Sequence, residues 1–217
     1  MTIVDLQKAI GVHPDGQFGP ASKAALIAAM TNRQAAAASP ADIAAIAARL
    51  GATPAQLRAV AAVESSGGGF DTSGRPKILF ERHLFHRMTD GKWSLAPFSN
   101  PVGGGYGESS WAKLSEAAAR DPDAALAACS WGKFQVLGMH WSKLGYASPW
   151  DLAHSTVSGE AAHYELFARY IEVFGATDEL RRVSADAGDC APFAEVYNGT
   201  GFRQFAYDQR IARWMAA

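Results

Sequence analysis

The sequence predicts a mostly α-helical protein with one small β element and a short helical module at its N-terminus. Apolar residues recur at helical spacing from residue 108 onwards. One apolar run, at residues 78–80, has the character of a strand, and residues 89–107 are so rich in Gly, Pro and Ser that we expect a long irregular loop. With 217 residues, 48% of them hydrophobic, the chain can build one core and a small appendage.

Residues 1–30 have the pattern of two helices joined by a tight turn. Apolar residues have helical spacing in IVDLQKAIGV, and Asp15-Gly16 marks a turn before the helical pattern ASKAALIAAM. Residues 31–39 are polar and Ala-rich and have no hydrophobic face, which favours a linker. We therefore expect a module over 1–30, a linker over 31–39 and a main domain over 40–217.

The main domain begins with two helices that have clear start signals. Ser39 caps the first, which we expect to end at Gly51, and Thr53 starts the second, which runs to about Glu64. A strand is expected within GRPKILFERHLF, and a later helix is expected over DPDAALAACSW.

Composition excludes several classes of function. The net charge of -1 gives no basic field that could hold nucleic acid or anionic lipid. No run of eighteen apolar residues is present, so we expect no membrane insertion. The N-terminus lacks the basic start and apolar region of a signal peptide, which predicts synthesis and initial residence in the cytoplasm.

Cysteine and histidine spacing gives no reason to expect a metal or another cofactor. Cys129 and Cys190 are too few for a disulfide scaffold, and Cys129 is expected to be a buried thiol, although a bridge between the two stays open. His83 and His86 could share a helix face, but no zinc-binding spacing accompanies them.

Three separated motifs carry candidate functional residues, and their order along the chain is informative. VESSGGGF carries Glu64, CSWGKFQVLG carries Ser130 and Gln135, and VYNGTG carries Tyr197 and Asn198. This set resembles the lysozyme-like superfamily, in which a Glu-Ser pair ends a helix and a Ser-x-Gly-x-x-Gln turn and a Tyr-Asn pair follow. With GRPKILFERHLFHRMT and NPVGGGYG added, residues 40–217 resemble the N-acetylmuramidase domain of bacteriophage endolysins.

The resemblance implies an α+β lysozyme-like fold and hydrolysis of the β-1,4 bond between N-acetylmuramic acid and N-acetylglucosamine. It implies that Ser130 and Gln135 line the floor of a sugar cleft and that Tyr197 and Asn198 hold an N-acetyl sugar. The expected partner is bacterial peptidoglycan, reached in the periplasm after holin-dependent release, and the protein is expected to be a monomer.

The first thirty residues resemble a peptidoglycan-binding module. Leu6-Gln7 and DGQFGP match its signature, but the third helix of such modules is missing. The alternative is a helical extension that only packs against the main domain.

Glu64 is the expected general acid. The acid in glycoside cleavage must keep its proton near neutral pH, and burial in an apolar site raises a carboxyl pKa by up to about 3–5 units. The aliphatic helix before Glu64 supplies such a site, the negative end of that helix also disfavours the carboxylate, and the glycines after it allow close approach of a sugar. An exposed helix-end acid is the alternative.

Glu81 is the expected second carboxylate, either a nucleophile or the base that activates water. If the strand continues through ILFERH, Glu81 shares a face with Leu79 and His83. The alternative is a structural ion pair with a neighbouring basic residue (Arg75, Lys77 or Arg82).

Other acids are expected to be structural. We expect Asp71 to cap a turn, with a groove residue as the alternative. We expect Glu108 to lie in the first turn of a helix, and Glu160 and Glu165 to be solvated on a long amphipathic helix.

Two other functions remain open. A lytic transglycosylase cleaves the same bond without water and typically lacks a second carboxylate, so Glu81 discriminates against it. A non-catalytic wall-binding or virion protein is the third reading, and the retention of Glu64 with the whole motif set argues against it.

Overall fold

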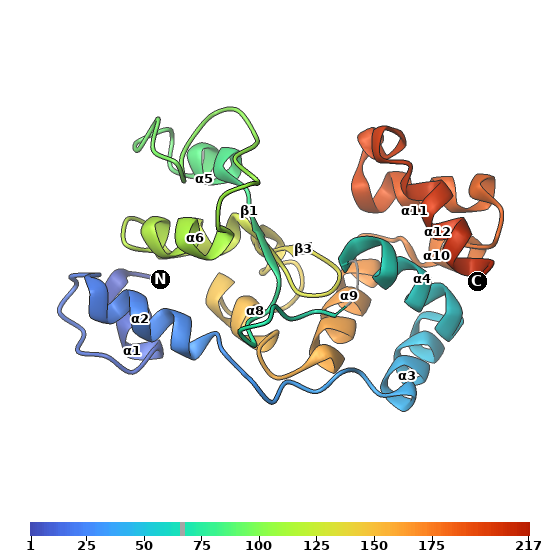
Figure 1. Cartoon of the computed structure of the whole chain (residues 1–217), viewed down its shortest axis with the longest axis horizontal. Coiled ribbons are helices and arrows are strands. Elements are labelled where there is room, and N and C mark those ends of the chain that lie inside the picture. The colour runs from blue at the N-terminus through green and yellow to red at the C-terminus, as the bar shows by residue number, and fades with distance from the viewer. Residues whose placement is uncertain (66–67) are drawn as a thin grey trace.

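The computed structural model describes residues 1–65 and 68–217, and it is mostly helical around one small sheet. Figure 1 shows the N-terminal and C-terminal helices at opposite ends of the long axis, with the sheet between them. The helices before the sheet are α1 (Ile3–Ala9), α2 (Pro20–Ala29), α3 (Pro40–Leu50) and α4 (Pro54–Ser65). The later helices are α5 (Arg82–Met88), α6 (Ser110–Ala118), α7 (Pro122–Ala127), α8 (Pro149–Ser155), α9 (Glu160–Val173), α10 (Thr177–Arg182), α11 (Ala187–Asn198) and α12 (Tyr207–Met215), with short 3-10 turns at Gly138–His140 and Thr200–Phe205.

The two helices that lead to the site begin where the sequence predicts. Ser39 Oγ accepts the N–H of Asp42 at 3.1 Å, and Asp42 accepts the N–H of Ser39 at 2.9 Å, which closes a capping box at the start of α3. Gly51 ends α3 with φ +63, a conformation that glycine adopts without strain. Thr53 and Gln56 exchange the corresponding bonds at the start of α4.

The sheet is antiparallel with strand order β1-β2-β3, built from β1 (Ile78–Phe80), β2 (Cys129–Trp131) and β3 (Val136–Leu137). Ser130 in β2 pairs with Leu79 on one side and with Leu137 on the other. The strand predicted at 78–80 is confirmed. The helix predicted over DPDAALAACSW is wrong in its second half, because α7 ends at Ala127 and a strand begins at Cys129. A short apolar run buried on both sides has no period that separates strand from helix.

A second correction concerns the end of β1. The strand stops at Phe80, Glu81 is the N-cap of α5, and the expected alternation therefore does not reach His83. Glu81 itself keeps an extended backbone, with φ -94 and ψ 91.

The N-terminal helices share the core of the main domain. Leu6, Leu26 and Met30 belong to the same cluster of buried apolar side chains as Phe80 and Phe167. At the rim of this contact, Lys23 in α2 forms an ion pair of 2.5 Å with Glu116 in α6. The predicted linker runs along the main domain, where the carbonyl of Ala36 accepts the N–H of Glu160 at 2.9 Å.

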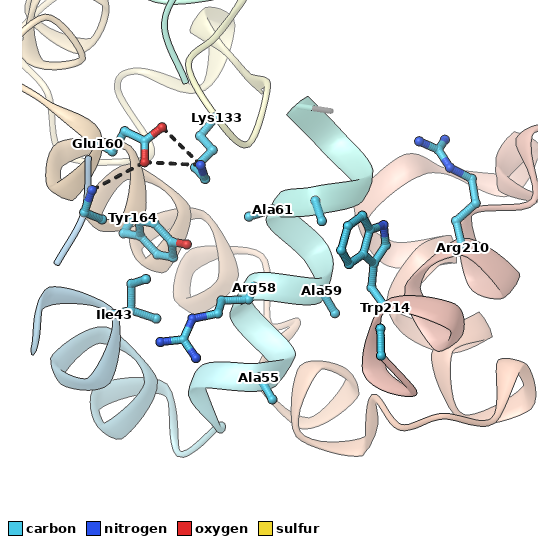
Figure 2. Close-up of a pocket in the computed structure, with 13 residues that line it drawn as sticks. Ile43, Ala55, Arg58, Ala59, Ala61, Lys133, Glu160, Tyr164, Arg210 and Trp214 are labelled. Atoms are coloured by element: carbon cyan, nitrogen blue, oxygen red, sulfur yellow. Dashed lines mark hydrogen bonds and ion pairs between the residues drawn. The ribbon is translucent and has the colours of Figure 1, made fainter. Parts of the chain in front are cut away.

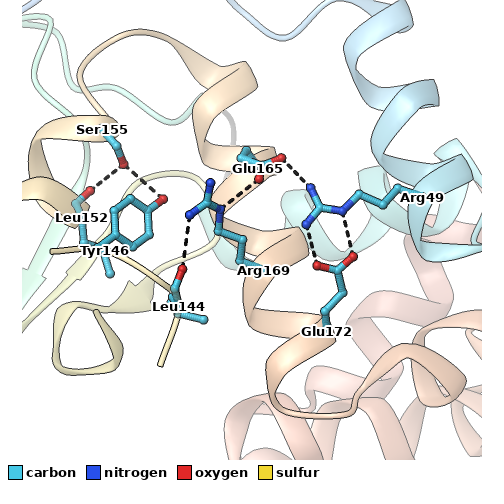
Figure 3. Close-up of polar contacts among 8 residues, drawn as sticks. All are labelled: Arg49, Leu144, Tyr146, Leu152, Ser155, Glu165, Arg169 and Glu172. Atoms are coloured by element: carbon cyan, nitrogen blue, oxygen red, sulfur yellow. Dashed lines mark hydrogen bonds and ion pairs between the residues drawn. The ribbon is translucent and has the colours of Figure 1, made fainter. Parts of the chain in front are cut away.

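A surface network ties α3 to α9. Figure 3 shows Arg49 between Glu165 and Glu172, with ion pairs of 2.8 and 2.5 Å, while Glu165 also accepts from Arg169. Glu165 is thus on the surface, as expected, but is paired.

Two features bear on the expectations from composition. Cys129 and Cys190 are free and buried, which confirms the buried thiol expected at Cys129. In the part of the chain that the structure describes, no helix combines the length and the apolar character needed to cross a membrane.

Candidate active site

Glu64 lies in the last turn of α4 and faces the C-terminal helices. Asn198, the last residue of α11, donates its side-chain amide to Glu64 Oε1 at 3.0 Å. Arg210 in α12 donates to the carbonyl of Val63 at 2.8 Å, which holds its positive charge beside the same turn. The carboxyl of Glu64 is therefore held by α11, and the turn that carries it is held by α12, although both helices follow it by more than a hundred residues.

Burial raises the pKa of Glu64 to about 7, while the Asn198 hydrogen bond and the charge of Arg210 hold it from rising further. A carboxyl with this pKa is about half protonated at neutral pH. It can therefore give a proton to a leaving group and take one back in a later step.

Glu64 opens onto a cavity of about 380 Å³. Its walls come from the end of α4, from β1, from the start of α6 and from the turn after β2 (Glu64, Ser65, Asp71, Lys77, Ile78, Leu79, Ser110, Trp111 and Gln135). This cavity offers a carboxyl, an amide, an aromatic ring and apolar side chains to one ligand, a lining typical of small-molecule sites.

Lys77 and Asp71 fix the loop that borders this cavity. Lys77 Nζ donates to the carbonyl of Ser65 at 2.9 Å and so places a cation at the negative end of α4. Asp71 accepts the backbone N–H groups of Ser73 and Arg75 at 2.8 and 3.0 Å, and the Arg75 guanidinium at 2.9 Å. The prediction that Asp71 caps a turn is confirmed, although its side chain also borders the cavity.

Ser130 and Gln135 bond to each other across the turn between β2 and β3. Ser130 Oγ donates to Gln135 Oε1 at 2.8 Å, and Gln135 Nε2 donates to the carbonyl of Gly132 at 2.7 Å. Gln135 has φ +50 and lines the cavity, whereas Ser130 does not line it. The pair shapes the floor of the site by holding this turn.

Tyr197 supports the same turn from beneath. Its hydroxyl donates to the carbonyl of Phe134 at 2.7 Å, its ring stacks on Phe193 at 5.4 Å between centroids, and burial raises its pKa well above the ordinary value. The structure thus gives the Tyr197 hydroxyl a backbone partner, while its neighbour Asn198 bonds Glu64.

Glu81 has partners that the sequence did not predict. Its Oε2 accepts the Tyr106 hydroxyl at 3.0 Å and lies 3.2 Å from His83 Nδ1. The alternative expectation, an ion pair with Arg75, Lys77 or Arg82, is wrong, because these side chains bond elsewhere. Arg75 bonds Asp71, Lys77 bonds Ser65, and Arg82 bonds Val102 and Gly103. Glu81 does not line the cavity of Glu64, although Leu79, two residues before it, does.

Glu160 was expected to be solvated, and the structure corrects this. The residue is only 7% exposed, and its Oε1 accepts the N–H of Gly69 at 2.6 Å and the ammonium of Lys133 at 3.0 Å. Burial by itself raises the pKa of Glu160, but these two donors bring it below its ordinary value. Through these two partners, Glu160 joins the segment at Gly69 to the turn that carries Gln135.

His163, one turn further along α9, packs against both of these segments. Its Nδ1 accepts the N–H of Lys133 at 3.0 Å, so its Nε2 carries the proton and donates to the carbonyl of Thr156 at 2.7 Å. A Cβ atom on Gly69 would lie 2.3 Å from His163 Nδ1, and one on Gly132 would lie 2.9 Å from the same ring. Sequence reasoning missed this cluster, whose only local signal is the glycines that make room for the ring.

Comparisons with known proteins show the family of this chain. Residues 53–217 match the family model for N-acetylmuramidase. A solved structure, the crystal structure of a Burkholderia AP3 phage endolysin, is similar to this chain with a TM-score of 0.74 and 29% sequence identity. The alignment covers 99% of this chain and 93% of that one, so it extends over the N-terminal helices. No curated protein sequence matches.

Proposed function

Since this chain belongs to the N-acetylmuramidase family, we propose that Glu64 is the general acid with which it cleaves the β-1,4 bond between N-acetylmuramic acid and N-acetylglucosamine. The chain is a glycoside hydrolase of the lysozyme type, and its substrate is peptidoglycan. One observation carries the assignment of Glu64: a buried carboxyl with a pKa of about 7 opens onto the cavity beside β1.

Protonated Glu64 donates to the oxygen that links the two sugars, and positive charge develops on the sugar that is left behind. Asn198 keeps the carboxyl pointed at this oxygen, because its amide holds Glu64 Oε1 and leaves Oε2 for the proton. Gln135 forms the floor under the sugar, and Ser130 and Tyr197 hold Gln135 and its turn in position.

Glu81 is our candidate for the second carboxylate. Side chains alternate along an extended chain, so Glu81 is the next residue after Leu79 on the same side of the chain. Two extended residues place it about 6.6 Å further along. The Tyr106 hydroxyl fixes its carboxylate. In this position it can orient water toward the charged sugar, which ends in a reducing muramic acid.

A lytic transglycosylase is the second candidate, and one observation favours it: Glu81 does not line the cavity that Glu64 lines. In that reaction the muramic 6-hydroxyl takes the place of water and closes an anhydro ring.

By likeness to the AP3 phage endolysin, we propose that the protein lyses a bacterial host for a phage. It would act as a monomer on the cell wall after release from the cytoplasm. The N-terminal helices are proposed to add affinity for the wall.

Mass spectrometry of digested, purified peptidoglycan tests the function. We expect products with a reducing end, heavier by one water than the anhydro form, from the wild type and none from Glu64→Gln. Anhydro products would assign the transglycosylase reaction, and equal cleavage by Glu64→Gln would refute the role of Glu64.

A further inference from the structure

A second and larger cavity lies along α4. It has a volume of about 970 Å³ and lies between α3, α4, α9 and α12. Figure 2 shows α4 along its middle, with Arg58 on one side and Trp214 on the other. The ring of Trp214 is 56% exposed, and alanines of α4 form much of the floor. We call this cavity the α4 groove.

The side chains around the α4 groove carry an excess of positive charge. Arg58, Lys133 and Arg210 line it, against the single acidic side chain of Glu160, which Lys133 neutralises. Within the described part of the chain, Arg58 makes no hydrogen bond or ion pair. An unpaired guanidinium on one side of an apolar floor, with an exposed indole on the other side, suits an anionic ligand that also has apolar parts.

The α4 groove is close to the catalytic carboxyl because both use the same helix. Arg58 precedes Glu64 by six residues, which is about 9 Å along a helix axis. Arg210 lines the groove and also donates to the carbonyl of Val63, the residue before Glu64. The groove and the Glu64 cavity are therefore less than two helical turns apart along α4.

We propose that the α4 groove binds the peptide stem of the muramic acid next to the scissile bond, a role that rests on the proposed cleavage of peptidoglycan at Glu64. The stem starts at the lactyl group of that sugar and carries carboxylates along its length and at its end. Four extended residues span about 13–14 Å, enough to pass from the sugar to Arg58. Its carboxylates pair with Arg58 and Arg210, and its methyl and methylene groups cover Trp214.

The test compares two forms of one substrate: soluble glycan chains with tetrapeptide stems, and the same chains after an amidase has removed the stems. We expect wild type to cleave the stem-bearing chains with the higher kcat/KM. Arg58→Ala should lower the ratio of the two kcat/KM values about tenfold, the effect of one charge-assisted contact. Trp214→Leu should also lower it, and Arg58→Lys should restore part of it.

Arg213→Ala is the matched control, because Arg213 is exposed on α12 beside Trp214 but does not line the groove. It removes the same charge from the same region and should keep the wild-type ratio. Glu64→Gln should cleave neither substrate, so loss of the chemistry is distinguished from loss of the stem preference.

Direct binding gives a second readout that needs no cleavage. Free tetrapeptide stem should quench the tryptophan fluorescence of wild type and of Glu64→Gln, and this quenching should be lost in Arg58→Ala. Three results would overturn the proposal: equal kcat/KM of wild type on stem-bearing and stem-free chains, an unchanged ratio of these two values in Arg58→Ala, or no binding of free stem. Loss of binding to phosphatidylglycerol vesicles in Arg58→Ala, with the ratio unchanged, would assign the groove to a lipid surface instead.

Discussion

Glu64 illustrates how burial and two neighbours set the properties of one carboxyl. Burial raises its pKa to about 7, and Asn198 and Arg210 limit the rise. A pKa near 7 suits a general acid. An acid with a much lower pKa has lost its proton at pH 7, and an acid with a much higher pKa is a weaker proton donor.

The first prediction is that Glu64→Gln loses activity and gains stability. Activity should fall at least ~10²-fold, since an amide cannot donate the proton. The folded state raises the pKa of Glu64 from 4.5 to about 7, so the carboxylate destabilises the fold as pH rises through this range. Glu64→Gln should therefore be more stable than wild type at pH 8, by up to roughly 3 kcal/mol.

Thermal unfolding at pH 4.5 and pH 8 checks this. The two proteins should have similar melting temperatures at pH 4.5 and separate at pH 8. A variant that melts below wild type at pH 8 would show that ionised Glu64 is stabilised by its surroundings.

The second prediction concerns Asn198. Its hydrogen bond holds the pKa of Glu64 down, so Asn198→Ala should raise that pKa. The alkaline limb of the pH profile of kcat/KM reports the general acid and should move to higher pH. Gln204→Ala, an exposed residue of the same C-terminal region, is the control and should leave the limb in place. If Asn198→Ala lowers the rate without moving the limb, Asn198 contacts the substrate instead.

At the level of elements, α9 holds the two segments that border the site. Glu160 and His163 lie one turn apart on α9, and together they contact Gly69 on one segment and Lys133 on the other. A change in this cluster should therefore reach the cavity even though the ring of His163 does not line it.

The third prediction is that His163 makes the fold sensitive to acid. Burial lowers the pKa of His163 from 6.5 to about 4. The neutral ring stabilises the fold above pH 6.5, and this contribution is lost as pH falls from 6.5 through 4, because the unfolded chain takes up the proton first. Glu64 contributes in the opposite direction over nearly the same range, so the two effects partly cancel in wild type.

The comparison is therefore made in the Glu64→Gln background. There the melting temperature should fall between pH 6.5 and pH 4, and adding His163→Gln should flatten that fall while lowering stability at pH 7. An equally steep fall after His163→Gln would assign the acid sensitivity to another group.

The fourth prediction is that Gly69→Ala disrupts the site through His163. The added Cβ would lie 2.3 Å from His163 Nδ1, far inside contact distance, so the loop after Glu64 or the ring must shift. We expect a loss of several kcal/mol of stability, the scale of severe overpacking, and a loss of activity. Gly201→Ala is the control, since a Cβ there meets nothing within 4 Å. Near wild-type stability in Gly69→Ala would mean that the ring moves freely.

These contacts also explain which parts of the structure could be predicted from the sequence. The start of α3 at Ser39 and its end at Gly51 depend on neighbours within four residues, and both were predicted. The strand at Cys129 depends on Phe80, its partner in β1, some fifty residues earlier. Glu160 likewise owes its burial to Gly69, more than ninety residues away. Long-range partners leave no periodic signal in the chain.

At the scale of the whole molecule, the N-terminal helices and the main domain form one body. Leu26 and Met30 are fully buried in the shared core, and the amino group of Met1 pairs with Asp123. The sequence predicted these helices and their turn, and it left packing against the main domain as the alternative to wall binding. The shared core is direct evidence for the packing role.

The last prediction separates these two roles. Deleting residues 1–30 should lower the melting temperature, because it exposes the apolar surface of α6 and its neighbours that Leu26 and Met30 cover. Cleavage of soluble glycan chains, measured well below that temperature, should stay near wild type, since no residue before Asp71 other than Glu64 and Ser65 lines the Glu64 cavity. Binding to intact sacculi should weaken if the module adds affinity for the wall. If binding is unchanged while stability falls, the N-terminal helices serve only to complete the core.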